Sequence, residues 1–531
     1  MNALSATGGR FCGTYAAFAI WAIICAVILG GGSRGAYLAG TALQLATIPV
    51  LLLALNEISR ASTPRRIKLA AISCGLIALV PLLQIVPLPP LLWNAIPAHK
   101  IFTEMFDLTG QSTVWMPLSV TPAATQLAIT SLIPAAAIFL VTLLLDRAER
   151  RLMTLVLLAA GLISVILGIT QVARGPNSRL RFFEFTNLTE AVGFFANRNH
   201  FASLLYVLLV FASFWTIHAT LTEDVFSRRN PLNTALILKI GWFSVLVLLI
   251  VAQALTRSRA GMGLTILALL GAFGLAALDK RATGNRNPTR LIFSGAAVVA
   301  ILLSGEFVLY RLMERFASDP LADARVTFSH ATVEAARSFM PLGSGLASFA
   351  PIYAMFEHPE TTIANIYANQ AHNEFLQLWL EEGVLGIALM IGFGVWLVVR
   401  LISIWNPKSI GTMELDIALM RAASIAVVLL IAHSSVDYPL RTGAMMSVMA
   451  FCCALLIEPP DEARRRQSAS PTRSHAPSLA PITPPLPPAE RANWGKSVEW
   501  PDAWRTQSNT TTTPAKPKTP AQFSKPPEKP S

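Results

Sequence analysis

The sequence predicts an all-α polytopic membrane protein with about twelve transmembrane helices. Of its 531 residues, 53% are hydrophobic and only 14% are charged, whereas a soluble domain carries roughly a quarter charged residues. The apolar runs reach about 18 residues or more, which is the length of a membrane-spanning helix. Because no run alternates apolar and polar residues as a barrel strand does, we expect the spans to be helices.

Twelve apolar runs set the predicted topology. They cover approximately residues 14–29, 36–55, 69–85, 123–145, 152–171, 201–217, 236–255, 261–278, 291–309, 384–401, 418–433 and 442–457. With the amino terminus in the cytoplasm, every inner loop carries Arg or Lys, which satisfies the positive-inside rule and places both termini in the cytoplasm. The first run lacks a small-residue cleavage site, so we interpret it as a retained span.

Three regions follow from these patterns. Residues 1–193 are expected to form amino-terminal transmembrane helices, and residues 194–457 a transmembrane core with one long periplasmic loop, 310–383, that contains short helices. Residues 458–531 are rich in Pro, Ser, Thr and Lys and cannot bury a core, so we expect a disordered, Pro-rich cytoplasmic tail. Much of the net charge of +12 comes from this tail and the inner loops, which favours anionic lipid and not nucleic acid as a partner.

The predicted outer face carries many arginines but only one lysine, Lys100. A guanidinium binds phosphate bidentately and stays charged beside lipid, so this bias indicates an anionic ligand. Arg257 and Arg259 are especially costly in their short outer turn, and both could face one ligand only if the backbone there is extended. Arg198 and Arg325 lie in other outer segments. Snorkelling and local ion pairs are the alternative explanation.

The longest polar interval ends with residues 371–383, directly before an apolar span. As a helix, this segment would gather three polar side chains on one arc: Glu374, Gln377 and Glu381. His372 falls on the opposite, apolar arc, where an imidazole is out of place unless it is packed or used. If Asn369 caps the helix, His372 lies in its first turn, where the positive helix end favours the neutral imidazole.

Two further outer segments carry polar side chains. Asn197 and His200 would share one face of a helix at the start of a span, where a helix cap and membrane anchor is the alternative interpretation. Asp437 and Arg441, between the last two spans, are expected to pair at the membrane edge. The histidines and glutamates of residues 330–374 match no metal-ligand spacing, so no metal site is predicted.

Together, these segments resemble the O-antigen ligase and polymerase superfamily over residues 194–440. The resemblance is carried in order by Ser258-Arg259-Ala260-Gly261, by Arg325 with Pro341-x-Gly343-x-Gly345, and by His372-Asn373-Glu374-Phe375-Leu376-Gln377 ahead of Glu382-Gly383-x-x-Gly386. Asn197-Arg198-Asn199-His200-Phe201 and His433-x-x-x-Asp437-x-Pro439 are also similar to segments of that family. One departure is Ser329, because many members carry tryptophan four residues after the loop arginine.

The resemblance implies a bacterial inner-membrane glycosyltransferase without a metal or other cofactor. Such enzymes move a glycan from undecaprenyl pyrophosphate, at the periplasmic face, to an acceptor hydroxyl. Residue by residue, Arg259 and Arg325 would bind the pyrophosphate and His372 would be the catalytic histidine. Arg257 and Arg198 are further candidates for the pyrophosphate. Candidates for acceptor binding or support of the site are Asn197, His200, Asn373, Glu374, Asp437 and Arg441.

The residue types suit that chemistry. Fixed guanidinium groups near lipid would stabilise the charge that grows on a leaving pyrophosphate, and His372 would act as the base for the acceptor hydroxyl in a single, inverting displacement. A packed histidine is the alternative for His372. The expected partners are a lipid-linked oligosaccharide donor, a glycan or lipid acceptor, and envelope polysaccharide assembly proteins.

Other function classes remain open at this point. A solute transporter would have a similar number of spans, but it should carry polar residues near the membrane midplane and broken helices in related halves. Here the polar residues gather at one face, which favours an enzyme. A scaffold for an envelope assembly machine would explain the tail but not the outer arginines. Within the enzyme class, the sequence does not separate a polymerase from a ligase.

Overall fold

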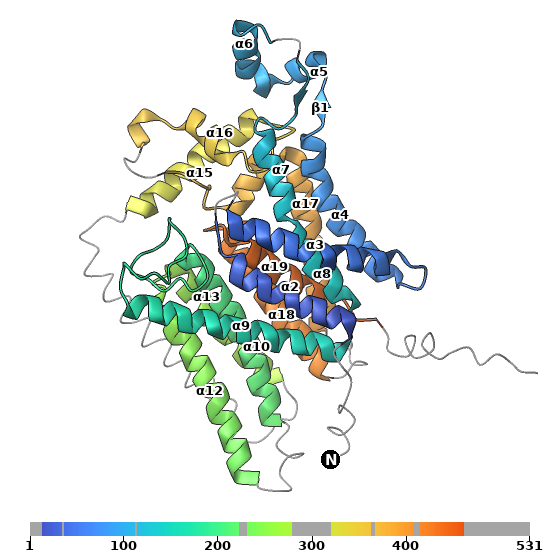
Figure 1. Cartoon of the computed structure of the whole chain (residues 1–531), viewed down its shortest axis with the longest axis vertical. Helices are drawn as coiled ribbons and strands as arrows, with labels where there is room; N and C mark the ends of the chain where they lie inside the picture. Colours follow the sequence, from blue (N-terminus) through green and yellow to red (C-terminus); the bar gives the residue numbers. More distant parts are fainter. Residues whose placement is uncertain are drawn as a thin grey trace, which may run out of the picture. The chain divides into compact units, whose positions relative to one another are not determined.

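The computed structural model describes residues 13–33, 37–111, 114–221, 231–278, 320–362, 367–406 and 414–460. Over these residues the chain is an assembly of α-helices joined by short connections (Figure 1). The predicted span 291–309 and the predicted tail beyond residue 460 lie outside the described residues. The predicted domain boundaries stay a prediction.

The longer helices cover most of the described chain. They are α2 (Thr14–Leu29), α3 (Leu38–Ser59), α4 (Arg65–Gln84), α7 (Pro122–Ser131), α8 (Ile133–Leu144), α9 (Arg147–Ala173), α10 (Arg198–Leu221), α12 (Pro231–Leu255), α13 (Arg259–Leu278), α15 (Pro320–Ser338), α17 (Glu374–Trp405), α18 (Glu414–Ser434) and α19 (Gly443–Leu455). The short elements are β1 (Pro87–Leu88), α5 (Pro90–Asn94), η1 (Pro97–His99), α6 (Lys100–Leu108), β2 (Met116–Pro117), α16 (Phe349–Phe356), η2 (Pro359–Thr361) and η3 (Pro439–Arg441).

Among the described residues, eight helical segments are long and apolar enough to cross a membrane. They are Leu38–Ser59, Arg65–Gln84, Pro122–Leu144, Arg147–Ala173, Arg198–His218, Arg259–Ala276, Glu374–Trp405 and Leu415–Ser434. Three shorter apolar helices accompany them: Thr14–Leu29, Ile240–Leu255 and Gly443–Leu455. The chain is therefore a multi-pass, helical membrane protein, as predicted, whereas the count of twelve spans stays a prediction.

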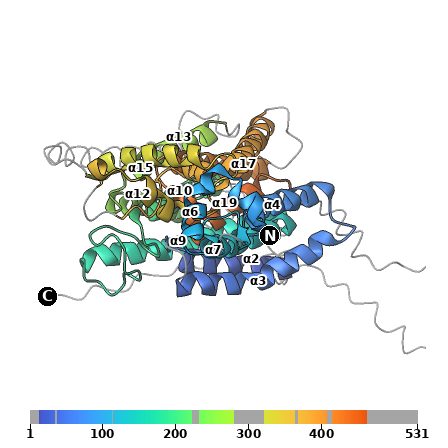
Figure 2. The ribbon, with the colours of Figure 1, turned by 90° about the horizontal axis from the view of Figure 1, so that it is seen from above.

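Helix α10 is the most deeply buried of these spans, with 89% of its apolar window buried inside the protein. It packs against α9, α12, α13, α18 and α19, and in Figure 2 it lies toward the middle of the helices. Its residues are apolar on all sides, which is the pattern expected of a helix surrounded by protein. Since α10 is held from several sides, the polar residues at its amino-terminal end are well placed to support a site.

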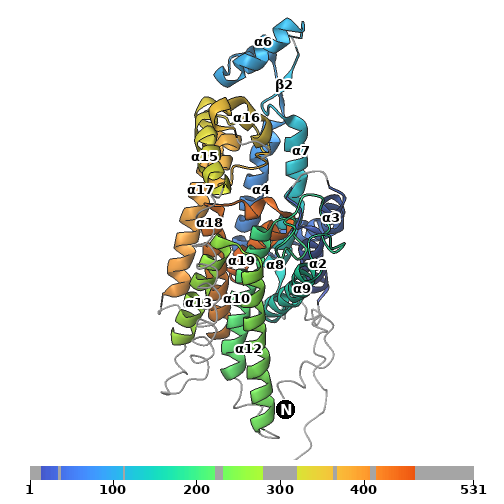
Figure 3. The same ribbon diagram turned by 90° about the vertical axis from the view of Figure 1, so that its left-hand side faces the viewer.

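One end of the bundle carries additional short elements, visible above the spans in Figure 3. Helices α15 and α16 lie there, together with an arm formed by β1, α5, α6 and β2. In the arm, β1 and β2 are antiparallel, with Pro87 opposite Pro117 and Leu88 opposite Met116. The described parts of the predicted outer loop, 320–362 and 367–383, thus contain helices α15, α16 and η2, while the side of the membrane on which the loop lies stays a prediction.

Helix α17 is interrupted at Gly383, which has φ 58° and ψ −138°. At this break, the turn 341–345 packs directly against the helix backbone. Val384 N donates to Pro341 O at 2.8 Å, and Gly345 N donates to Glu381 O at 2.9 Å. The glycines of the Pro-x-Gly-x-Gly segment therefore allow a close approach between two backbones.

Replacing Gly383 with alanine is expected to lower the free energy of unfolding by about 1–3 kcal/mol or more, because a left-handed backbone is unfavourable for a residue with a Cβ. The added Cβ would also lie 2.2 Å from the carbonyl oxygen of Pro341. Thermal unfolding of the detergent-solubilised protein measures the effect. The control is Gly392→Ala in the same helix, where an added Cβ meets no atom within 4 Å. Equal unfolding midpoints for the two variants would contradict this explanation.

Candidate functional site

His372 lies immediately before α17 and not within its first turn. The helix is capped by Asn373, whose Oδ1 accepts hydrogen bonds from Phe375 N and Leu376 N, both at 3.1 Å. The predicted cap at Asn369 and the predicted helical position of His372 are therefore wrong by about one turn. His372 itself has φ 52°, a left-handed conformation that is uncommon for residues other than glycine.

The polar arc predicted for this helix does exist, and it faces inward. Gln377 is 1% exposed and Glu381 is fully buried, whereas Phe375 on the apolar arc is 38% exposed. The polar side chains are thus used within the protein, while Phe375 of the apolar arc is turned outward and Leu380 of the same arc is fully buried. Such an inversion is expected where lipid, and not water, surrounds a helix bundle.

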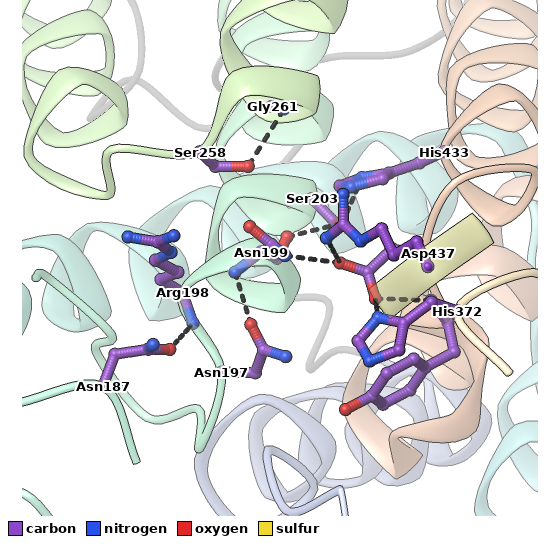
Figure 4. A network of polar contacts seen from close by, with 12 residues as sticks. Asn187, Asn197, Arg198, Asn199, Ser203, Ser258, Gly261, His372, His433 and Asp437 are labelled. Carbon is purple, nitrogen blue, oxygen red and sulfur yellow. Dashed lines mark hydrogen bonds and ion pairs between the residues drawn. The ribbon is translucent and has the colours of Figure 1, made fainter. Parts of the chain in front are cut away.

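The carboxylate of Asp437 is the centre of the site (Figure 4). His372 Nδ1 lies 3.1 Å from Oδ1, and Asn199 Nδ2 donates to Oδ2 at 2.5 Å. The backbone N–H of Tyr438 donates to Oδ1 at 2.9 Å, and Arg325 Nη2 lies 3.7 Å from Oδ2. Asp437 therefore joins groups from α10, α15 and the segment before α17, although its own side chain is only 1% exposed.

The surroundings of Asp437 keep it ionised. Burial alone would raise the pKa of this carboxyl, but the hydrogen bond from His372 and the charges of the neighbouring histidines outweigh burial and hold the pKa well below its usual range. An ionised carboxylate can only accept hydrogen bonds, so the Nδ1 of His372 that faces it carries the proton. In the neutral form of the imidazole, Nε2 is then the nitrogen that can accept a proton.

Tyr438 fills the space beside the histidine. Its ring centroid lies 4.8 Å from those of His372 and His200, in an edge-to-face arrangement in both cases. Its hydroxyl is hydrogen-bonded by the side chains of Asn197 and Asn369. Burial, and next to it the negative charge of Asp437, raises the pKa of Tyr438 to about 12, so the phenol remains neutral and packs as an aromatic wall.

Two buried histidines lie beside the site: His433 at the end of α18 and His200 at the start of α10. His433 Nδ1 is hydrogen-bonded to Ser203 Oγ at 2.9 Å and lies 3.2 Å from the hydroxyl of Tyr206. His200 is fully buried, and its ring nitrogens have no hydrogen-bond partner among the described residues. The structure therefore places His200 against Tyr438 as a packing residue.

The candidate arginines occupy different surroundings. Arg325 belongs to α15, and its side chain is 41% exposed. Arg257 and Arg259 are exposed at the turn between α12 and α13, where Ser258 caps α13 by accepting a hydrogen bond from Gly261 N at 3.1 Å. The turn is tight, with φ 52° at Arg257, and not extended as two arginines directed at one ligand would need.

The turn with Arg257 and Arg259 nevertheless lies beside the first turns of α10. Gly261 packs so closely on Ala202 that an added Cβ would lie 2.6 Å from the Cβ of Ala202. Figure 4 shows Ser258 and Gly261 next to Asn199, the α10 residue that binds Asp437. The turn that carries Arg257 and Arg259 therefore lies close to the α10 residues that surround Asp437.

Arg198 and Asn197 have local structural roles. Arg198 forms an ion pair with Glu190, with 2.6 Å between Nη1 and Oε1, and Figure 4 shows its side chain directed away from Asp437. Asn197 Oδ1 accepts a hydrogen bond from Asn199 N at 2.8 Å, which is a cap at the start of α10. Arg198 thus forms a local ion pair and Asn197 is a helix cap, which are the alternative interpretations of these two residues.

The expected pair between Asp437 and Arg441 does not form. Arg441 Nη1 lies 2.8 Å from Glu381 Oε2 instead. Glu374 Oε1 accepts a hydrogen bond from Leu440 N at 2.7 Å. Arg441 and Glu374 therefore connect the segment after Asp437 to α17 and do not point to a ligand.

A cavity of about 1050 Å³ opens beside His372, between α15, the start of α17 and the segment after α18. It is lined by Arg325, Val326, Ser329, His330, Val333, Glu334, Arg337, Ser338, His358, His372, Asn373, Ser435 and Val436. Ser329, at the position where family members often carry tryptophan, donates to the carbonyl of Arg325 at 2.9 Å and leaves that helix intact. The cavity has the size of a ligand site and brings two arginines, three histidines and the amide of Asn373 to its wall.

Some members of this site were not selected from the sequence. The sequence did not identify four of them as site residues, because their roles depend on contacts between distant segments. These four are Asn199, Tyr438, Ser203 and His433. The one available signal was the spacing of Asn199 and Ser203, which places both on one face of α10. Among the described residues, no group of three or more His, Cys, Asp or Glu side chains is arranged to hold a metal ion.

Part of the chain matches a known family. Residues 244–391 match the family model described as O-antigen ligase. That segment includes Arg257, Arg259, Arg325 and His372, whereas α10 and Asp437 lie outside it. No curated protein matches the chain. The match confirms the resemblance deduced from the sequence: residues 244–391 of the chain are similar to the O-antigen ligase family.

Proposed function

We propose that this protein is a glycosyltransferase of the bacterial inner membrane that moves a glycan from undecaprenyl pyrophosphate to an acceptor hydroxyl at the periplasmic face. The observation that carries this proposal is the contact between His372 and the buried, ionised Asp437 at the wall of a cavity that also contains Arg325. This arrangement supplies a base and a cation within one site. The family match over residues 244–391 supports the same class of reaction.

In the proposed reaction, His372 is the general base. The oxygen of the acceptor hydroxyl attacks the anomeric carbon, while the hydroxyl proton passes to Nε2 of His372. Asp437 holds the imidazole through Nδ1 and stabilises the imidazolium that forms. The bond between the anomeric carbon and the pyrophosphate oxygen breaks in the same step, so the configuration at that carbon is inverted.

The electron pair of the broken bond leaves with undecaprenyl pyrophosphate. We assign Arg325 and Arg259 to this group, because fixed guanidinium groups at the edge of a low-dielectric region stabilise charge as it develops. Arg257 is not included, because the turn, with φ 52° at Arg257, is not extended and does not direct both of its arginines at one ligand. Pyrophosphate is already a fair leaving group, and the arginines supply positive charge, so the proposed reaction requires no metal ion. Arg198 is not included, since Glu190 already neutralises it.

The reaction is tested by reconstitution. The purified protein, placed in proteoliposomes with undecaprenyl-pyrophosphate-linked glycans extracted from a strain that lacks the gene, should release undecaprenyl pyrophosphate and form a longer or transferred glycan. Failure to release undecaprenyl pyrophosphate with both its own lipid-linked glycans and a range of acceptors would overturn the proposal.

The periplasmic placement of the cavity predicts a labelling pattern. In a variant whose five native cysteines are replaced by alanine, Ser435→Cys at the cavity wall should react with a membrane-impermeant maleimide added outside spheroplasts. Ala148→Cys is the matched control, because Ala148 is exposed at the start of α9, in a predicted inner loop. It should react only after the membrane is permeabilised. The reverse pattern would contradict the proposed orientation.

A further inference from the structure

A second polar cluster lies near His372 and Asp437 but outside the cavity. The proposed reaction does not use it. We call Gln377, Glu381 and Arg441 the support ring. Arg441 Nη1 lies 2.8 Å from Glu381 Oε2, and Gln377 Nε2 donates to Glu381 Oε1 at 2.9 Å. None of the three lines the cavity, so they are not placed to touch a substrate.

The cluster ends on the backbone next to the catalytic histidine. The N–H of Ala371 donates to Gln377 Oε1 at 3.0 Å, and Ala371 is covalently joined to His372. Ala371 is fully buried, so water does not provide a substitute partner for this N–H group. The glutamine side chain therefore fixes the peptide group between Gln370 and Ala371, one residue before the peptide group that joins Ala371 to His372.

The other end of the cluster, Arg441, is linked to Asp437 through the chain. Arg441 follows Asp437 by four residues, in the segment that connects α18 to α19. Leu440, next to Arg441, donates its N–H to Glu374 Oε1 at 2.7 Å. The backbone near each member of the catalytic pair is thus hydrogen-bonded to a side chain of α17. His372 and Asp437 also contact each other directly.

The backbone of His372 explains why such an anchor is needed. Its φ of 52° is unfavourable for a residue with a Cβ and persists only where surrounding contacts hold it. If the peptide relaxed to an ordinary negative φ, the imidazole would move away from Asp437. The contact with Asp437, at 3.1 Å, does not by itself fix the backbone.

We propose that Gln377, Glu381 and Arg441 are positioning residues that hold His372 in its left-handed backbone conformation against Asp437. For its catalytic consequence this inference rests on the proposed function; its structural part does not. The ring should affect the rate of the chemical step and not the binding of the lipid-linked donor, because its members lie outside the cavity.

The test is Gln377→Met, which keeps the length of the side chain but removes its hydrogen bonds with Ala371 N, Gln370 and Glu381. Hydrogen–deuterium exchange of the protein in lipid nanodiscs should show the amide of Ala371 exchanging about tenfold faster or more, because its acceptor is lost. In the transfer assay with extracted undecaprenyl-pyrophosphate-linked glycans, kcat should fall about tenfold or more while KM for the donor stays within about twofold, as expected when only the chemical step is affected.

Two further variants complete the test. Gln44→Met makes the same change in α3, at a half-buried glutamine outside the site, and should leave exchange at Ala371 and kcat unchanged. Arg441→Lys keeps the positive charge but loses the guanidinium geometry, so it should produce a smaller loss of kcat than Gln377→Met. It also serves as a second perturbation if Gln377→Met does not fold.

The outcomes separate this inference from the proposed function. Unchanged exchange at Ala371 in Gln377→Met overturns the inference, and so does faster exchange with unchanged kcat. A donor KM that rises in proportion to the loss of activity also overturns it. If the wild-type protein transfers no glycan, the proposed function fails, while the exchange measurement still decides whether the ring holds the His372 backbone.

Discussion

Replacing His372 with alanine is expected to lower the rate of glycan transfer by on the order of 10²- to 10⁴-fold, the usual contribution of a positioned general base. In the proposed reaction the imidazole accepts the proton of the acceptor hydroxyl, and the described residues place no other histidine both in contact with Asp437 and at the cavity wall. Release of undecaprenyl pyrophosphate by proteoliposomes measures the effect.

The control is His218→Ala, which removes a histidine from the opposite end of α10. It should leave the rate within about twofold, because a substitution away from the site usually has a small effect. Both variants should retain the thermal stability of the wild-type protein in detergent. Retained transfer in His372→Ala would show that His372 only packs against Phe328 and Tyr438, whose ring centroids lie 6.1 Å and 4.8 Å from its own.

Replacing Asp437 with asparagine is expected to cause the second largest loss, about 10²-fold or more. The amide keeps the shape of the carboxylate but can stabilise the opposite tautomer of His372, with the proton on Nε2, and it no longer stabilises an imidazolium. It would also present an NH₂ group or a neutral oxygen to Asn199 and Arg325, which now face a carboxylate at 2.5 Å and 3.7 Å.

The matched control for this change is Asp416→Asn. Asp416 is an ion-paired carboxylate on α18, with Arg147 and Arg151 at 3.3 Å and 3.6 Å, and it lies far from His372 in the helix bundle. It should cost stability without selective loss of kcat. If Asp437→Asn transferred glycan at the wild-type rate, Asp437 would be a structural anchor and His372 would not need it.

The membrane-spanning helices could be predicted from the sequence because hydrophobic length alone determines them. The starts of α2, α9, α13 and α18 follow the predicted apolar runs to within a few residues of the observed helices. The start of α17 was predicted less well. Asn369 and Asn373 are equally suitable caps by residue type, and the structure has Asn373 as the cap, which no local pattern reveals.

The charged residues of the site show the same limit more clearly. Asp437 and Arg441 are four residues apart with opposite charges, so a local pair was the natural expectation. The structure pairs Arg441 with Glu381, 60 residues earlier, and Asp437 with Asn199, 238 residues earlier. The sequence could indicate which residues were unusual for a membrane protein, such as His372 and Arg325, but the pairing of those residues depends on the packing of α10, α15 and α17.

The central claim, that this chain transfers a glycan from undecaprenyl pyrophosphate by means of His372, is tested most directly in cells. The gene is deleted, complemented with the wild type or with His372→Ala at equal membrane levels, and the undecaprenyl-pyrophosphate-linked glycans are measured by mass spectrometry. We predict that lipid-linked glycan accumulates in the deletion strain, that the wild type clears it, and that His372→Ala does not. Accumulated single repeat units would identify a polymerase, and accumulated long chains a ligase. No accumulation in the deletion strain, or clearance by His372→Ala, would contradict the claim.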